Sequence, residues 1–140
     1  MRKPSKKTLS KNFRLQTNED LRRFCKLADK RYFNGKLPIS RILFDSGLGE
    51  HCHANTHPIM YRRVLGGKCV HEVQMYHITV NTRLRRWRDL VRMTVYHEMV
   101  HVELYALGLS SKENSCLKDG NRFNQRMAEL AQAGAFNGLW

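Results

Sequence analysis

The sequence predicts an α+β fold in which a small antiparallel three-stranded sheet packs against about three helices. Two stretches, one near each end of the chain, place apolar residues at helical spacing. Short apolar segments bounded by turn residues occupy the middle, and a long apolar helical pattern with two histidines follows them. Because no internal repeat interrupts this order in 140 residues, we expect one domain over 17–140.

The first helix is expected to begin after Thr17, a good N-cap residue that acidic residues follow in the first turn. Asn34-Gly35 is expected to end this helix, and Pro38 prevents it from resuming. The core face of the helix consists of apolar residues at helical spacing: Leu21, Phe24, Cys25, Ala28 and Tyr32.

Three strands are expected next. Residues 39–44 form a short apolar segment between Pro38 and a turn. Residues 59–64 and 69–80 flank Leu65-Gly66-Gly67-Lys68, whose two glycines indicate a hairpin. Residues 46–57 are polar and rich in histidine, with weak periodicity, and we interpret them as a loop.

The longest helical pattern covers residues 89–107, with Gly108 as its stop. Residues 112–119 form a polar connection after it. Helical spacing then returns and predicts a last amphipathic helix, whose apolar residues are Phe123, Met127, Leu130 and Ala131.

The long helix carries His97-Glu98-Met99-Val100-His101, the H-E-x-x-H pattern. Histidines four residues apart lie on the same helix face, so both imidazoles can bind one Zn²⁺ ion. Glu98 lies about 100° round the helix, where its carboxylate can act as general base toward a zinc-activated water. The alternative is two core or surface histidines with a glutamate between them.

A catalytic zinc site of this kind needs a third protein ligand. No histidine follows His101, and Asp119 comes after a connection long enough for the chain to turn back. We expect Asp119 to be the third ligand; its alternative is a helix N-cap or turn residue, and His53 or His57 could take its place. A second metal site is a further alternative without a recognised spacing: His51, Cys52, His53, His57, Cys69 and His71.

Four segments match one known family from about Leu21 to Leu130. They are the F-x-G-x-L-P segment in 32–38, Ile78-Thr79-Val80-Asn81 with Leu84, the H-E-x-x-H pattern, and Asp119-Gly120-Asn121-Arg122-Phe123. In these segments the chain resembles the SprT-like metallopeptidase domain of bacterial SprT and of the Spartan proteases, which act on DNA–protein crosslinks. The family usually has histidine as third zinc ligand where Asp119 stands. The resemblance therefore implies a zinc endopeptidase with an aspartate in that place.

Charge points to a second partner. Lys and Arg number 25 against 12 Asp and Glu, a formal net charge of +13, which attracts polyanions such as DNA. Residues 1–16 hold six basic residues, among them Lys6 and Lys7, and no acidic one, and we expect a flexible basic arm.

A second basic segment precedes the long helix. It consists of arginines around one tryptophan, with a further arginine one turn later: Arg83, Arg85, Arg86, Trp87, Arg88 and Arg92. Arginines beside an aromatic ring suit phosphate contact and base stacking. The alternative is a solvated helix start with Trp87 half-buried in the core.

The sequence shows no apolar run long enough for a bilayer and no secretory signal. Its four cysteines are scattered, without a C-x-x-C pair. We therefore expect a monomer with reduced thiols in the cytoplasm, or in the nucleus if the source is eukaryotic.

Two functions from different classes follow. The first is a zinc-dependent endopeptidase with protein substrates on or near DNA. The second is a non-catalytic nucleic-acid-binding protein that keeps the fold with a degenerate or structural metal site. The presence of Glu98 argues against the non-catalytic function, because a structural metal site needs no general base. Zinc-dependent hydrolysis of a non-peptide bond is a weaker third option.

Overall fold

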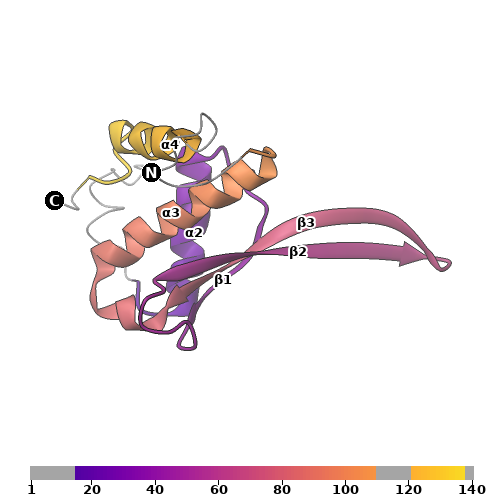
Figure 1. Cartoon of the computed structure of the whole chain (residues 1–140), viewed down its shortest axis with the longest axis horizontal. Helices are drawn as coiled ribbons and strands as arrows, with labels where there is room; N and C mark the ends of the chain where they lie inside the picture. Colours follow the sequence, from indigo (N-terminus) through magenta and orange to yellow (C-terminus); the bar gives the residue numbers. More distant parts are fainter. Residues whose placement is uncertain (1–14, 110–120, 138–140) are drawn as a thin grey trace, which may run out of the picture.

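The computed structural model of the chain describes residues 15–109 and 121–137 (Figure 1). Three α-helices and a three-stranded sheet in these residues confirm the α+β class. The elements are α2 (Asn18–Tyr32), β1 (Ile39–Asp45), β2 (Ala54–Leu65), β3 (Lys68–Asn81), the 3-10 helix η1 (Thr82–Arg86), α3 (Arg88–Ala106) and α4 (Asn121–Gln132).

The sheet is mixed, so the expectation of an antiparallel sheet was wrong for one strand. The strand order is β1-β3-β2, with β2 antiparallel and β1 parallel to β3. The hairpin through Gly66 and Gly67 is confirmed, and both glycines have positive φ. Strand β3 lies in the centre because its inner end is the most apolar, with Ile78 and Val80 fully buried.

Strand β2 begins at Ala54, five residues before the predicted start, so only 46–53 of the predicted loop lie outside a strand. The sequence pattern did not indicate this extension, because β2 is an edge strand whose first residues are mostly polar and show no alternation of apolar and polar side chains. Their backbone partners decide the matter: Ala54, Asn55 and Thr56 pair with Val80, Thr79 and Ile78.

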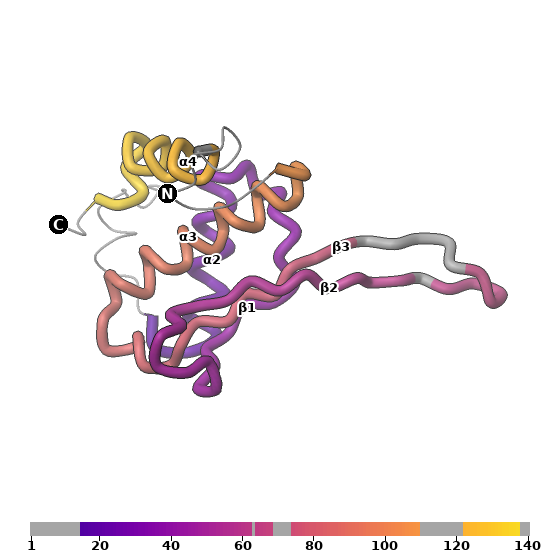
Figure 2. Tube along the Cα trace, viewed as in Figure 1, coloured from indigo at the N-terminus to yellow at the C-terminus, as the bar shows by residue number. Residues whose placement is uncertain are grey.

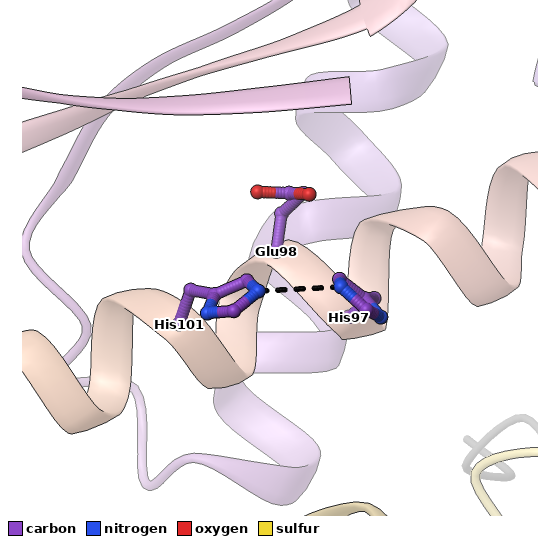
Figure 3. Close-up of side chains that lie close together, drawn as sticks. All are labelled: His97, Glu98 and His101. Carbon is purple, nitrogen blue, oxygen red and sulfur yellow. Dashed lines mark hydrogen bonds between the residues drawn. The ribbon is translucent and has the colours of Figure 1, made fainter. Parts of the chain in front are cut away.

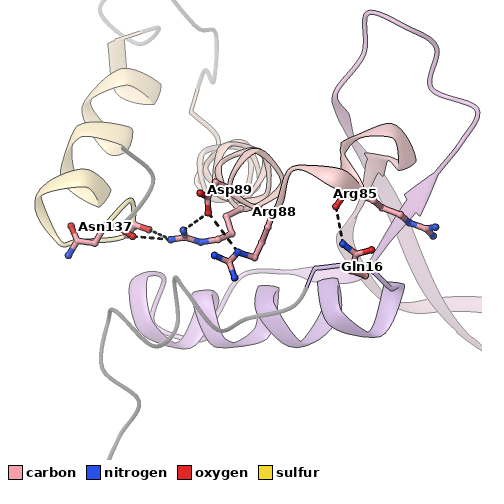
Figure 4. A network of polar contacts seen from close by, with 7 residues as sticks. Gln16, Arg85, Arg88, Asp89 and Asn137 are labelled. Atoms are coloured by element: carbon pink, nitrogen blue, oxygen red, sulfur yellow. Dashed lines mark hydrogen bonds and ion pairs between the residues drawn. The ribbon is translucent and has the colours of Figure 1, made fainter.

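Both ends of α2 follow the sequence signals. The Thr17 side chain accepts a hydrogen bond from the backbone N–H of Asp20, and the Asp20 carboxylate accepts one from the backbone N–H of Thr17, forming a capping box. Beyond the helix, Asn34 and Gly35 have φ of 62° and 69°, the left-handed conformation that stops a helix. Of the predicted basic arm, the structure describes Leu15, which is buried, and Gln16, which donates to the Arg85 carbonyl at 3.2 Å (Figure 4).

The core lies between α2, α3 and one face of the sheet. Sheet residues that alternate along β1 and β3 contribute to it: Ile42, Phe44, Tyr76, Ile78 and Val80. Helix α3 is buried on several sides, since Met99, Val100 and Val102, which point in different directions round the helix, have no exposed area. Tyr96 makes edge-to-face contacts with Phe24, Tyr32 and Phe136.

Arg92 is buried, which corrects its assignment to the basic surface segment. Only 1% of the residue is exposed, and its guanidinium donates to the carbonyls of Ala135 and Asn137 at 3.3 and 3.5 Å. It also pairs with Asp89 at 3.3 Å, in the network of Figure 4. Arg92 thus joins α3 to the turn after α4 instead of facing solvent.

Helix α4 is tied to the rest of the fold by Arg126. Its guanidinium donates to the carboxylate of Glu103 on α3 and to the carbonyl of Tyr32 at the end of α2, both at 2.6 Å. The same group lies 4.9 Å from the centre of the Phe33 ring. This contact set holds α4 against α3 and the end of α2.

The hairpin of β2 and β3 extends well beyond the helices (Figures 1 and 2). On the sheet face opposite the core, Arg41, His77 and His57 stand side by side on three adjacent strands. Burial, and after it the charges of Arg41 and His57, lower the pKa of His77 below its ordinary value. No helix in the described part of the chain has the length and apolarity needed to cross a membrane.

We expect Arg41→Gln to raise the pKa of His77 toward the ordinary histidine value, because it removes a neighbouring positive charge. Since the folded-state pKa is below the unfolded one, protonation of His77 disfavours folding as pH falls through that range. NMR titration of the His77 ring measures the shift. Arg62→Gln, further along β2, serves as the control; an equal effect of both substitutions would contradict a local cause.

Candidate metal centre

His97 and His101 converge on α3 as the spacing predicts. Their Nε2 atoms lie 3.2 Å apart, with the rings inclined by 67° (Figure 3). With the Glu98 carboxylate they form the group whose ligand atoms all lie within 4.8 Å of one another, the one such group among the side chains that the structure describes. Both rings are partly exposed, while Glu98 is buried.

The geometry of the two imidazoles fits a tetrahedral metal ion. Two nitrogens, each about 2.0–2.1 Å from one zinc ion at a tetrahedral angle, are themselves about 3.3 Å apart. The separation of 3.2 Å between the Nε2 atoms agrees with this value without rearrangement of the helix. Imidazole nitrogen is also a ligand that zinc prefers.

Glu98 points from α3 toward the sheet rather than along the histidine row (Figure 3). Its carboxylate accepts a hydrogen bond from the Thr56 hydroxyl on β2. Thr56 faces α3 because β2 continues from Ala54 beside the helix. The contact fixes the carboxylate between α3 and the edge strand, next to the two imidazoles.

Aromatic rings support both histidines. The Phe123 ring, from the first turn of α4, lies 4.7 Å from the His97 ring and 4.6 Å from the His101 ring, centre to centre. On the other side of His101, Tyr105 is stacked at 6.0 Å and is itself stacked on Tyr76 at 5.8 Å. These contacts restrict both imidazoles to orientations that face one cleft.

The cleft has a volume of about 620 Å³ and runs between α3, the start of β2 and α4. Polar residues of 51–56 form one wall, while Leu90, Met93 and Met127 supply apolar area. The loop before β2 is held by Asn81: its side chain donates to the carbonyls of Gly49 and Cys52 at 2.8 Å. Its backbone also donates to the His53 carbonyl at 2.8 Å.

The predicted third ligand, Asp119, lies outside the described residues, so its assignment stays a prediction. Of the alternatives, His53 lines the cleft together with His51 and Cys52. His57 does not line it, because it follows Thr56 in a strand and faces the opposite side, beside His77. His57 was therefore wrong as an alternative ligand.

A second metal site made of loop and hairpin residues is also ruled out. Cys69 and His71 pair with Val64 and Arg63 near the tip of the hairpin. At about 3.3 Å per residue, the ten residues from Ala54 to Val64 separate that tip from the loop by about 30 Å. The two sets cannot meet at one ion.

The basic segment before α3 is on the surface. Trp87 is 52% exposed, so it is about half-buried as the alternative expected, but it is not one of the buried core residues. The guanidinium of Arg86 lies 5.3 Å from the Trp87 ring, and that of Arg85 lies 5.0 Å from the Phe44 ring. Arg88 pairs with Asp89 at 3.9 Å (Figure 4), and Arg83 is exposed in η1. Lys6 and Lys7 lie outside the described residues.

Three residues of the centre were missed by the sequence reasoning as parts of the site: Thr56, Asn81 and Tyr105. The sequence contains a signal for Asn81, because an asparagine directly after an apolar strand often hydrogen-bonds the backbone of a neighbouring loop. Tyr105 is one turn beyond His101, at i+4, and this spacing places it on the same helix face. The sequence contains no signal for Thr56, because its contact with Glu98 depends on the unexpected start of β2.

Comparison of this chain with protein-family models, with curated proteins and with solved structures finds no match.

Zinc titration of substituted chains should identify the third ligand. We expect Asp119→Ala to weaken zinc binding by at least about tenfold and Asp119→His to retain it, since carboxylate and imidazole both suit zinc. Competition with a chromophoric chelator measures the affinities. His53→Ala and Cys52→Ser are the matched controls; a larger loss in either of them than in Asp119→Ala would assign the ligand to the loop.

Proposed function

We propose that the chain is a zinc-dependent endopeptidase of the SprT-like type that acts on proteins on or near DNA. The observation that supports it most directly is the pairing of two zinc-compatible imidazoles with a buried carboxylate in one open cleft. A structural zinc site is closed by four protein ligands and has no use for such a carboxylate. A cleft beside the imidazoles leaves room for a substrate.

His97 and His101 would hold the ion, and a zinc ion held there supplies Lewis acidity toward water and a peptide carbonyl. Glu98 would accept the proton of the attacking water and later deliver it to the amine that leaves. Its contact with Thr56 keeps the carboxylate at the wall of the cleft. The low exposure of Glu98 limits competing contacts with solvent.

Strand β2 would bind the substrate backbone. It is an edge strand of the sheet, and its first residues border the cleft. An extended peptide can pair with such an edge through main-chain hydrogen bonds, which gives little sequence selectivity. Leu90, Met93 and Met127 would accept an apolar side chain of that peptide.

The position of α4 is the basis for proposing Asp119 as the third zinc ligand. The helix begins two residues after Asp119, and its Phe123 ring contacts both imidazoles. This closeness of the start of α4 to both imidazoles supports the assignment. Aspartate in place of histidine would make the ligand set more anionic.

DNA is proposed as the partner that brings substrates close. The net charge of +13 and the exposed arginines around Trp87 support this assignment. We place the protein in the cytoplasm, or in a nucleus, where Cys25 and Cys52 remain free thiols.

Glu98→Gln should leave zinc affinity within about threefold of the unsubstituted chain and lower peptide hydrolysis by about 10²–10⁴-fold. The reason is that the amide keeps the shape of the side chain but cannot accept a proton. Cleavage of an unfolded protein substrate, with zinc content measured in parallel, tests this. Undiminished cleavage by the purified variant would contradict the mechanism, and a metal-loaded chain with no cleavage in either form would favour the non-catalytic alternative.

Replacing Arg85, Arg86 and Arg88 by Ala should flatten the salt dependence of DNA binding, with a decrease of about two to three in the slope of log affinity against log salt. Each arginine that contacts a phosphate displaces condensed counterions. The matched control removes three exposed basic residues of α2: Arg22, Lys26 and Lys30. Equal slopes for both triple variants would mean that the segment before α3 has no special part in DNA binding.

A further inference from the structure

The face of the sheet opposite the core carries an unusual set of side chains. In the part of the chain that the structure describes, the helices pack on the face with Ile42, Phe44, Ile78 and Val80. The alternate residues point the other way. On that opposite face Arg41, His77 and His57 form a row across β1, β3 and β2, here called the cationic row.

The side chains of the cationic row offer hydrogen-bond donors to a bound anion. Neighbouring strands place side chains of one row about 5 Å apart, and the Arg41 guanidinium and the imidazole N–H groups of His77 and His57 can all donate. Burial, and after it the nearby Arg41 and His57, disfavours protonation of His77. The one carboxylate of β1 on this face, Asp45, is four residues from Arg41 and accepts a hydrogen bond from Gly47. A bound anion would be held by the positive charge of Arg41 and would accept these hydrogen bonds.

An aromatic ring continues the same face along the hairpin. Tyr61 lies four residues from His57, so it points to the same side of β2, and it is 47% exposed. The distance along the strand is about 13 Å, the length of about four stacked nucleotides. Ile59 and Met75 lie between them as a paired, partly buried apolar row, and Asn55 and Thr79 pair on the other side of the cationic row.

We propose that this sheet face, which no described helix covers, binds single-stranded nucleic acid, with the cationic row at the phosphates and Tyr61 stacked on a base. Positive groups that follow a backbone and an aromatic ring beside them are the two elements of single-strand recognition. Unstacked bases of a single strand can lie against the surface of a sheet, whereas the bases of a duplex are already stacked on one another. The inference rests on the proposed action near DNA and names the surface that would hold it.

The position of this face relates it to the metal centre. Thr56 contacts Glu98 on the core side of β2, while the next residue, His57, belongs to the cationic row on the other side. A strand bound to the open face and a peptide bound in the cleft would thus be separated by the thickness of β2. Proteins attached to that nucleic acid would be delivered to the edge strand at the cleft.

The test is fluorescence anisotropy of a labelled oligothymidylate of about 20 nucleotides, and of a duplex of equal length, with the full chain. Tyr61→Ala should weaken single-strand binding about tenfold, and Tyr61→Phe should not, because the ring is kept. Met60→Ala is the matched control, since Met60 is also 47% exposed and lies on the opposite face of β2. Equal losses for Tyr61→Ala and Met60→Ala, or an equal loss on the duplex, would overturn the stacking role.

Arg41→Gln combined with His57→Gln should weaken single-strand binding and lower its salt slope by about one. Arg62→Gln removes one positive charge from the other face of the hairpin and should leave the single-strand affinity and its salt slope unchanged. Full binding by the double variant overturns the inference, as does the absence of oligothymidylate binding by the unsubstituted chain.

The endopeptidase proposal and the nucleic-acid proposal can be contradicted independently, because the first is tested by protein cleavage and the second by oligonucleotide binding. A chain that binds through the open face and cleaves nothing would contradict the endopeptidase alone. A chain that cleaves protein while the Arg41 and Tyr61 variants bind DNA normally would contradict this inference alone. Unfolding temperatures of all variants, followed by circular dichroism, would identify any that fail to fold.

Discussion

Helix α3 is packed between the sheet, α2 and α4, and this burial determines where its polar residues can be. A buried polar group is costly unless it has a hydrogen-bond partner. The terminal nitrogens of Arg92 find partners at Asp89 and at the carbonyls after α4, and Glu98 finds its partner at Thr56. The histidine row is the part of the helix that opens into the cleft. The same packing that stabilises the fold therefore holds the two imidazoles 3.2 Å apart.

Local signals in the sequence were sufficient for the three α-helices, the hairpin turn and the histidine pair. Thr17, Gly66-Gly67 and Gly108 mark ends that depend on backbone conformation a few residues away, so a sequence pattern contains them. The H-E-x-x-H spacing is likewise local to one helix. These parts could be predicted without knowing how the elements pack.

Features set by packing could not be predicted in this way. The parallel pairing of β1 depends on β3 entering between β1 and β2, which chain order does not reveal. The burial of Arg92 depends on carbonyls 43 and 45 residues away. The contact of Phe123 with both histidines requires α4 to fold back onto α3, where Arg126 anchors it. In each case the partner is distant in sequence and comes from another element.

The account depends on a metal held by the two histidines of α3, and X-ray absorption at the zinc edge tests this most directly. Two imidazole nitrogens and oxygen ligands at about 2.0–2.1 Å, with no sulfur, are the predicted surroundings of zinc in the loaded protein. A sulfur at about 2.3 Å would instead mean that Cys52 or another thiol binds the ion. That result, or a spectrum without imidazole scattering, would contradict the account.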